Sequence, residues 1–386
     1  MRGRIGFAAT FCFCIIIAGC GGGPSLPKMV ATPPSNNGGS PPPATTPTPS
    51  PTQSPMFNPA SVHIAEIPVP AQSPTSNGPV DPDTIDVGTD GAVYFGQINS
   101  GLATTGNFGI FRYFAGNITQ TLPFAQSGAS AGGVDAIDAH DSATVMWSSS
   151  YQFFPASIAF GDALECGGMG TASACAANAF GGFILSIVTA KDGTVWTAGA
   201  QCCGSGPGGY PAQLPADGAT ASAFALVLAN GPNSHVWGAL EHGGPIYEFG
   251  SSGAVLNTYA LPAGSVLTGT DELVQGTDGA LWFTDDGHNA IARITAAGQV
   301  TEFPIPTPGS GVASIAVATD GSMWFTETTA DKIGRIDTAG NIYEFAVPTP
   351  KAAPTAIAAV PATSSAGSAK LWFTETASNK IASVAY

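Results

Sequence analysis

The chain has 386 residues, with 50 glycines, 32 prolines, only 10% charged residues and a formal net charge of −15. Few charged residues and no sustained helical periodicity exclude a fold built mainly of amphipathic helices, and the many glycines favour tight turns between short strands. The excess of negative charge argues against nucleic acid and against adsorption to anionic lipid, so we expect no nucleic-acid partner.

The first 19 residues have the three parts of a secretory signal peptide. Arg2 and Arg4 provide positive charge, residues 5–17 form an apolar run too short to span a bilayer, and small residues follow. We therefore predict that residues 1–19 are a signal peptide that is removed, and that the mature chain is exported from a bacterial cell.

Cys20 follows these small residues directly, and the segment resembles a bacterial lipobox, in which cleavage leaves the cysteine as the lipidated first residue. The resemblance implies a lipoprotein that is attached to a membrane only through Cys20. Gly21 rather than aspartate comes next, a pattern typical of outer-membrane sorting, with the domain on the periplasmic or surface side, in cells with two membranes. A plain signal peptide with a cysteine at this place by chance is the alternative.

Residues 20–60 predict a disordered tether. They are nearly all glycine, proline, serine, threonine, alanine and asparagine, with few large apolar side chains. Such a segment cannot bury enough apolar surface to offset the entropy of ordering it. We expect it to hold a folded domain, residues 61–386, away from the membrane.

The domain is built from a repeat that is clearest between residues 276 and 348. Gly-Thr-Asp-Gly-Ala-Leu-Trp-Phe-Thr-Asp at 276–285 returns 42 residues later as Ala-Thr-Asp-Gly-Ser-Met-Trp-Phe-Thr-Glu at 318–327. Each copy is followed by Ile-x-Arg-Ile and then by Glu-Phe. Short apolar runs separated by turn residues at this period are typical of the four-stranded blades of a β-propeller.

The second copy predicts four strands in chain order. Residues 314–318 form an innermost strand, an Asp-Gly turn at 320–321 reverses the chain, and residues 323–326 run back beside it. Residues 332–337 alternate apolar and charged side chains as a third strand. Residues 342–347 form the outer strand, which ends before two prolines.

The aromatic residue that follows each turn predicts seven blades. All six tryptophans and one tyrosine take this position, at spacings of 41 to 53 residues: Tyr94, Trp147, Trp196, Trp237, Trp282, Trp324 and Trp372. The last repeat has a third strand at 381–385 but no outer strand, and residues 65–70 match residues 301–306 position for position. We predict an all-β, seven-bladed β-propeller whose N-terminal strand completes the last blade.

Four cysteines remain in the exported domain beside Cys20 and the two of the signal peptide. An even number in an oxidising compartment predicts two disulfides, with three pairings open. The absence of a Cys-x-x-Cys pair in the sequence argues against a zinc site at these cysteines. The disulfide candidates are Cys166, Cys175, Cys202 and Cys203.

The repeated motifs resemble those of the virginiamycin B lyase family. Trp-Phe-Thr-Glu, Lys-Ile-Gly-Arg-Ile and Glu-Phe-x-x-Pro carry the resemblance, which is sharp over residues 273–386, looser over 64–122 and weak between. It implies a seven-bladed propeller of the streptogramin lyase type, whose named enzyme opens type B streptogramins by magnesium-dependent elimination. It also implies a site at one mouth of the central channel, where histidines of the innermost strands join the glutamate of Trp-Phe-Thr-Glu.

The sequence keeps the acids of that implied site and lacks its histidines. Glu327 and Glu375 match the motif glutamate, and Asp285 takes the same position one blade earlier. The positions of the family histidines carry Asp83, Asp135, Leu185, Phe224, Asp271, Ala313 and Thr355. Counting from each turn, we expect Ala313 opposite Glu327 and Asp271 opposite Asp285. His242 and His288, on loops at the same face, are the histidines that could supply the missing base beside Glu327.

Six carboxylates are expected to converge on the channel mouth: Asp83, Asp135, Asp271, Asp285, Glu327 and Glu375. Carboxylate oxygens suit hard cations, so Asp271, Asp285 and Glu327 predict a site for magnesium or calcium. The alternative is that these acids are solvated or cap turns without a metal.

Two classes of function are open. The missing family histidines favour an envelope-anchored, monomeric binding or scaffolding platform for an unidentified small molecule, glycan or envelope protein. The alternative is a magnesium-dependent carbon–oxygen lyase like streptogramin B lyase, or a related enzyme acting on a lactone or ester, with Glu327, His288 and His242 in catalysis. The sequence has no Gly-x-Ser-x-Gly, phosphate-loop or dinucleotide motif, so hydrolase, kinase and dehydrogenase functions have no support.

Overall fold

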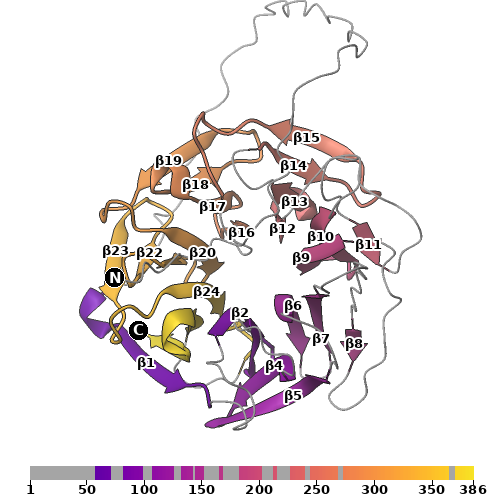
Figure 1. The fold of residues 1–386 in the computed structure, drawn as a ribbon. Coiled ribbons are helices and arrows are strands. Elements are labelled where there is room, and N and C mark those ends of the chain that lie inside the picture. The colour runs from indigo at the N-terminus through magenta and orange to yellow at the C-terminus, as the bar shows by residue number, and fades with distance from the viewer. Residues whose placement is uncertain are drawn as a thin grey trace, which may run out of the picture. The chain divides into compact units, whose positions relative to one another are not determined.

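Short strands make up most of the residues that are described in a computed structural model of the protein (Figure 1). The structure describes residues 57–70, 81–98, 107–125, 132–141, 144–151, 165–167, 182–201, 212–214, 227–239, 244–267, 273–364 and 370–386. All of them lie in one unit, residues 57–386. The predicted signal peptide, Cys20 and residues 21–56 lie outside this described part, in which no helix has the length and apolar character needed to cross a membrane.

Seven groups of strands, here called blades 1 to 7, follow one another along the chain. Blades 1 and 2 contain β2 (Asp81–Val87), β3 (Val93–Ile98), β4 (Asn107–Phe114) and β5 (Asn117–Ala125), then β6 (Gly132–Asp141), β7 (Thr144–Tyr151) and β8 (Glu165–Gly167). Blades 3 and 4 contain β9 (Gly182–Thr189), β10 (Val195–Gln201) and β11 (Ala212–Leu214), then β12 (Val227–Asn230), β13 (Val236–Ala239), β14 (Ile246–Phe249) and β15 (Val255–Tyr259).

The last three blades are complete four-stranded antiparallel sheets. Blades 5 and 6 contain β16 (Leu273–Gln275), β17 (Leu281–Asp285), β18 (Ala290–Ile294) and β19 (Val300–Pro304), then β20 (Val312–Val317), β21 (Met323–Glu327), β22 (Lys332–Ile336) and β23 (Ile342–Ala346). Blade 7 contains β24 (Pro354–Ala359), β25 (Leu371–Glu375), β26 (Lys380–Ala385) and β1 (His63–Pro68). Short 3-10 helices are η1 (Pro59–Ser61), η2 (Pro232–Ser234), η3 (Asp286–His288) and η4 (Thr376–Ser378).

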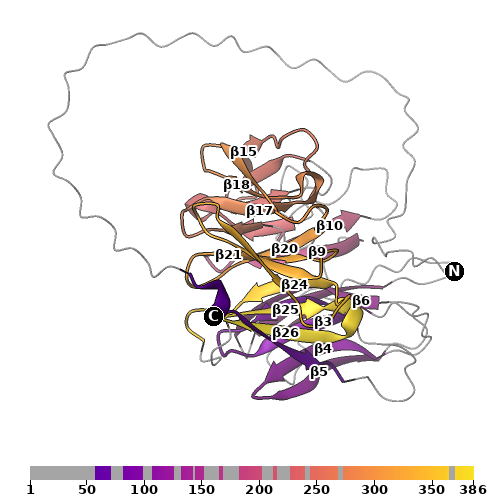
Figure 2. The same ribbon diagram turned by 90° about the vertical axis from the view of Figure 1, so that its left-hand side faces the viewer.

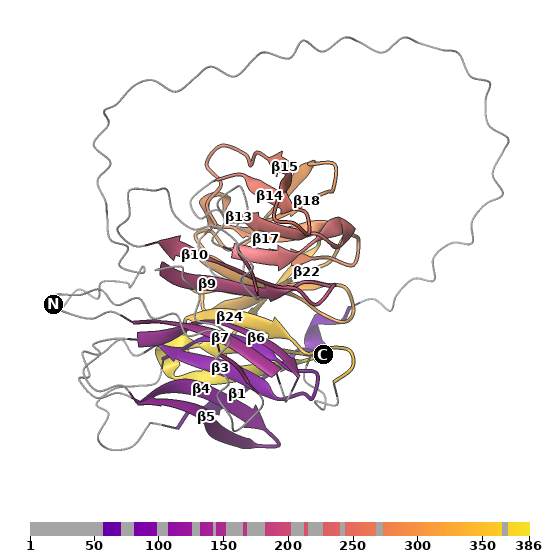
Figure 3. The same ribbon diagram turned by 90° about the vertical axis from the view of Figure 1, so that its right-hand side faces the viewer.

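The first strand of each blade contacts the first strand of the next. The contacts run from β2 through β6, β9, β12, β16 and β20 to β24, and β24 contacts β2 again. Seven innermost strands therefore surround one axis, which confirms the predicted seven-bladed β-propeller (Figure 1). From the sides, the blades lie as tilted layers, one above the other (Figures 2 and 3).

The apolar core lies between neighbouring blades. Trp237 of blade 4 shares one cluster with Phe283 of blade 5, and Trp282 of blade 5 shares the next with Phe325 of blade 6. All four side chains are completely buried. The repeated tryptophan and the phenylalanine that follows it thus fill the spaces between blades, because each large ring removes much apolar surface from water.

The N-terminal strand closes the ring, as predicted. β1 pairs antiparallel with β26 in a register that runs from His63 opposite Ala385 to Pro68 opposite Lys380. Beyond the ladder, the Val69 N–H donates to the Asn379 carbonyl oxygen at 3.0 Å. The two ends of the described chain therefore meet inside blade 7.

One detail of the predicted register is wrong. Val312, not Ala313, pairs with Glu327, because a β-bulge lies in β20 between Val312 and Ile315. Similar register shifts occur near the starts of β2, β6, β9 and β24. A bulge inserts an extra residue and re-aims the side chains around it. The bulged segments contain five positions that match the family histidines: Asp83, Asp135, Leu185, Ala313 and Thr355.

Candidate functional site: the central cavity and three buried acids

A cavity of about 290 Å³ lies where the seven innermost strands meet. Residues from all seven strands line it, and most are valine, isoleucine, leucine or alanine. Asp86 and Asp138 add charge to one side of the lining. Asp86 Oδ2 accepts a hydrogen bond from the Ala139 N–H at 2.6 Å, and Asp138 Oδ2 accepts one from the Thr189 N–H at 2.8 Å. The cavity therefore combines apolar side chains with polar groups, and its acids also tie blade 1 to blade 2 and blade 2 to blade 3.

The three motif acids lie inside the blades and are not part of this lining. Asp285, Glu327 and Glu375 end the second strands β17, β21 and β25, and none of them has exposed surface. Burying a carboxyl group is costly unless it is neutral or has partners, so the surroundings of each acid decide what it can do.

Blade 6 holds Glu327 beside a second carboxyl group. Glu344, on the outer strand β23, accepts a hydrogen bond from the Thr307 N–H at 3.0 Å and pairs with Lys332 Nζ at 3.3 Å. Burial and the charge of Glu344 raise the pKa of Glu327 to about 8, whereas the bonds from Thr307 and Lys332 outweigh burial and lower the pKa of Glu344. Near neutral pH Glu327 therefore keeps its proton and can donate it in a hydrogen bond to Glu344.

Blade 7 repeats this arrangement with a carboxylate from the closing strand. Glu66, on β1, accepts a hydrogen bond from the Thr349 N–H at 2.7 Å and also pairs with Lys380. Burial raises the pKa of Glu375 to about 7, although Ser378, which donates to Glu375 Oε2 at 2.8 Å, opposes the shift. The negative charge of Glu66 adds to the increase.

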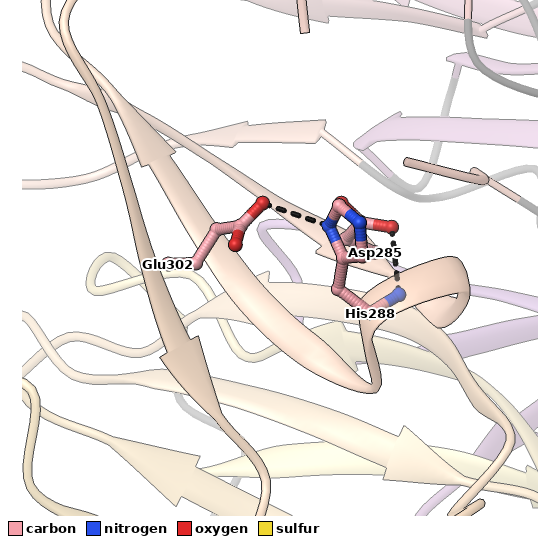
Figure 4. A group of neighbouring side chains, drawn as sticks. All are labelled: Asp285, His288 and Glu302. Carbon is pink, nitrogen blue, oxygen red and sulfur yellow. Dashed lines mark hydrogen bonds and ion pairs between the residues drawn. The ribbon is translucent and has the colours of Figure 1, made fainter. Parts of the chain in front are cut away.

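Blade 5 has a histidine where blades 6 and 7 have a lysine. His288 Nδ1 lies 2.9 Å from Glu302 Oε1 and 3.2 Å from Asp285 Oδ2 (Figure 4). The other ring nitrogen, Nε2, lies 3.2 Å from the carbonyl oxygen of Ala263, which can only accept a hydrogen bond. Asp285 Oδ1 accepts a hydrogen bond from the Val266 N–H at 2.9 Å. The bond to Glu302 is the main cause that raises the pKa of His288, against an opposing effect of burial.

The three blades thus share one device, which we call a latch. Each latch has an inner acid, a cation, an outer glutamate and a bond to the segment that enters the blade from the preceding one. The latches are Asp285, His288 and Glu302 in blade 5, Glu327, Lys332 and Glu344 in blade 6, and Glu375, Lys380 and Glu66 in blade 7. The bond to the entering segment is accepted by the motif acid Asp285 in blade 5 and by the outer glutamates Glu344 and Glu66 in blades 6 and 7, so these three carboxylates help to fasten successive blades to one another.

The predicted metal ligands are not gathered as one group within the described part of the chain. Asp271 lies outside that part, and Asp285 and Glu327 belong to different latches. The structure instead gathers Asp285, His288 and Glu302, whose ligand atoms all lie within 4.8 Å of one another. This is the group, among the described residues, with the donor atoms and spacing to hold a metal ion.

The remaining predicted residues are only partly described. Asp83 is half-buried in β2, and Asp135 lies in β6 with its side chain outside the description. His242 lies outside the described residues. Of the disulfide candidates, the backbone of Cys166 lies in β8, and the other three lie outside the described residues: Cys175, Cys202 and Cys203.

The outer glutamates are the site residues that the motif acids alone do not reveal. Glu302 and Glu344 are the glutamates of the repeated Glu-Phe motif, and Glu66 takes the same position in the closing strand. In blades 5 and 6 the outer glutamate comes 17 residues after the inner acid. This constant spacing is the sequence signal that could pair an outer glutamate with an inner acid.

A ring of antiparallel sheets around one axis, closed by the first strand, defines the protein as a β-propeller. Within this class, residues 211–386 match the model of the Virginiamycin B lyase family, so this part of the chain is similar to that family. The resemblance expected from the motifs is confirmed over that part of the chain. A search of curated proteins found no match.

Solved structures agree with this fold. A catalytically inactive variant of virginiamycin B lyase from Staphylococcus aureus, crystallised with quinupristin, is 21% identical with a TM-score of 0.57, and the alignment covers 84% of this chain and 99% of that one. Hydrazine synthase of Kuenenia stuttgartiensis is 12% identical with a TM-score of 0.55, over 82% of this chain and 99% of that one. At these identities the likeness shows the fold and not the activity.

Proposed function

We propose that the protein is an exported propeller that binds a ligand at the cell envelope, and that it does not carry the elimination chemistry of streptogramin lyases. The use of the motif acids inside the latches is the observation that supports this proposal. Glu327 and Glu375 are fully buried, and each lies beside a second carboxyl group and a lysine. A carboxyl group enclosed in this way cannot touch a substrate unless its blade opens.

The missing base supports the same proposal. Elimination next to a carbonyl needs a group that accepts a proton near neutral pH. The bulge positions Ala313 and Thr355 carry side chains that cannot do so, and both ring nitrogens of His288 face protein oxygens. The described part of the predicted site therefore offers no imidazole nitrogen directed at a substrate.

The cavity on the axis is the place that we assign to the ligand. Its volume of about 290 Å³ is at the lower end of the range for small-molecule sites. Its mixed apolar and polar lining and the carboxylates of Asp86 and Asp138 favour a small neutral or cationic molecule over an anion. We propose that the protein acts as a monomer, with this ligand or an envelope component as its partner.

Incubation with a type B streptogramin and magnesium tests the proposal directly. We expect the purified protein to leave the macrocycle intact in mass spectra over several hours, with an active virginiamycin B lyase as the positive control. Ring opening that disappears in Glu327→Gln would contradict the proposal. It would favour the alternative, a magnesium-dependent carbon–oxygen lyase or related lactone- or ester-acting enzyme, in which these acids would hold magnesium or calcium.

The membrane anchor is a separate part of the proposal. The apolar run before Cys20 and the small residues at its end support lipidation of this cysteine. When cells are extracted with a detergent that separates into two phases, we expect the natural protein in the detergent phase and Cys20→Ser in the aqueous phase. Equal partition of the two proteins would show that Cys20 does not anchor the chain.

A further inference from the structure

We propose that the latch of blade 5 is a binding site for a divalent transition-metal ion, with Asp285 Oδ2, His288 Nδ1 and a carboxylate oxygen of Glu302 as ligands (Figure 4). Asp285 is fully buried and fixes one side of the site. The side chains of His288 and Glu302 are 29% and 32% exposed, so an ion with its water molecules can reach the other side.

The distances in the latch fit zinc. In a tetrahedral site with metal–ligand distances of about 2.0–2.1 Å, two ligand atoms lie roughly 3.3 Å apart. His288 Nδ1 lies 3.2 Å from Asp285 Oδ2 and 2.9 Å from Glu302 Oε1. Both distances are within a few tenths of an ångström of that spacing, and the carboxylate oxygens of Asp285 and Glu302 lie within 4.8 Å of each other.

The bonds around the three ligands orient them as in metal sites. His288 Nε2 faces the Ala263 carbonyl oxygen, so Nε2 carries the proton and, in the neutral imidazole, the lone pair is on Nδ1. Asp285 Oδ1 accepts hydrogen bonds from the Val266 and His288 N–H groups at 2.9 and 3.3 Å. Within the described chain, Asp285 Oδ2 has no hydrogen-bond donor besides its ion pair with His288. Such supporting bonds to the second nitrogen and the second oxygen are typical of metal ligands.

Charge and donor type decide which ion fits. Two carboxylates and a neutral imidazole carry a formal charge of −2, which a divalent ion neutralises. A mixed set of oxygen and nitrogen donors suits zinc and its first-row neighbours, whereas magnesium and calcium prefer oxygen alone. In the other two latches Lys332 and Lys380 pair with the outer glutamates, and an ammonium group cannot ligate a metal. In the latch of blade 5, by contrast, a metal ion can take over the positive charge, because neutral His288 can ligate it.

Calorimetric titration of the purified mature protein with zinc chloride tests this site. We expect one zinc ion per chain. His288→Lys replaces the imidazole with an ammonium group, which cannot ligate a metal, and should lower zinc affinity at least tenfold. His235→Gln is the matched control, because His235 Nδ1 lies 2.6 Å from Glu248 Oε1 and, among the described residues, makes no ion pair with a second carboxylate. We expect this variant to bind zinc like the natural protein.

A second variant and a second metal keep the test decisive. Glu302→Gln should also weaken zinc binding at least tenfold, so a folding defect of one variant does not decide the outcome. Cobalt in place of zinc should give visible d–d bands without a thiolate charge-transfer band. The proposal is overturned by no heat at millimolar zinc, by equal binding in both variants and the natural protein, or by a thiolate band that assigns the ion to the cysteines.

Discussion

A chain that begins at residue 71 is expected to melt at least roughly 10 °C below the natural protein and to aggregate on heating. It lacks β1, so the edge of β26 is exposed as a template for pairing with other chains. It also loses Glu66, the outer glutamate of the blade 7 latch, and the buried Val69. Bringing together segments some 300 residues apart costs roughly 5 kcal/mol, which β1 offsets by burial and ladder bonds. Thermal unfolding followed by circular dichroism and light scattering measures both effects.

The matched control is a chain that begins at residue 57. It keeps β1, η1 and Phe57, whose ring lies 5.8 Å from that of Tyr386. We expect it to melt within about two degrees of the natural protein. Adding a peptide of residues 57–70 to the shorter chain should recover part of the lost stability, because the edge of β26 is then covered again. A chain from residue 71 that melts like the control would show that β1 does not close the ring.

The stability of the protein is expected to fall by a few kcal/mol between pH 5 and pH 9. Glu327 has a pKa of about 8 in the folded protein against 4.5 when unperturbed, and Glu375 has a pKa of about 7. Over this window the folded chain binds more protons than the unfolded chain, so unfolding becomes easier as pH rises, by about 1.4 kcal/mol for each unit of pKa shift. The contribution of both acids is complete below pH 4.5 and is lost as pH rises through 7 and 8.

The outer glutamates give the opposite dependence at low pH. The pKa values of Glu344 and Glu66 are lowered in the folded protein, so their contribution is present above pH 4.5 and is lost as pH falls through their folded values. We therefore expect maximum stability near pH 5. The melting temperature of the natural protein, measured from pH 3 to pH 9, should pass through this maximum.

Glu327→Gln measures how much of the pH dependence of stability comes from the inner acid of blade 6 rather than from other titrating groups. The glutamine amide can donate to Glu344 as the protonated acid does, but it cannot ionise. The variant should therefore lose much of the decline above pH 6 and melt above the natural protein at pH 9. Glu375→Gln should remove the part of the decline centred near pH 7. Asp192→Asn, a change at an exposed turn acid of blade 3, is the control: hydrogen bonds from Thr194 lower the pKa of Asp192, so the change should leave the decline above pH 6 unaltered. If the melting temperatures of all four proteins changed with pH in the same way, Glu327 and Glu375 would not be the acids that hold the extra protons in the folded protein.

Most of the fold can be predicted from the sequence because the repeat is strict. The aromatic residue that follows the turn in each repeat shows where the second strand of every blade lies. The match between residues 65–70 and 301–306 identifies the closing strand. The strand limits in blade 6 agree within two residues, since short apolar runs end at glycine, proline or polar turns.

The bulges could not be predicted in the same way. Counting pairs back from the turn at Gly321 assumes a regular ladder, and that assumption puts Ala313 opposite Glu327. An inserted residue leaves no mark in the alternation of such a short run, in which Ser314 is the only polar residue. The error falls at the start of the innermost strand, where the family histidines would be, so the register there decides how the site is built.

The latches show a second limit of sequence reasoning. Acids at the end of the second strand are predicted at an open channel mouth, because such positions form a site in the family that the motifs resemble. In the structure Glu327 and Glu375 turn toward glutamates of the outer strands and lose all exposure to solvent. Which side an acid at a strand end faces depends on its partners in three dimensions, and a spacing along the chain gives only candidates for them.

The position of the chain ends determines how the protein responds to a mechanical load. The first and last strands meet inside the sheet of blade 7, in a ladder that runs from His63 opposite Ala385 to Pro68 opposite Lys380. At the other blade boundaries the polypeptide itself continues from one blade to the next. Tension on the N-terminal segment is therefore borne first by the packing of Phe57 against Trp324 and Tyr386 and then by these backbone bonds.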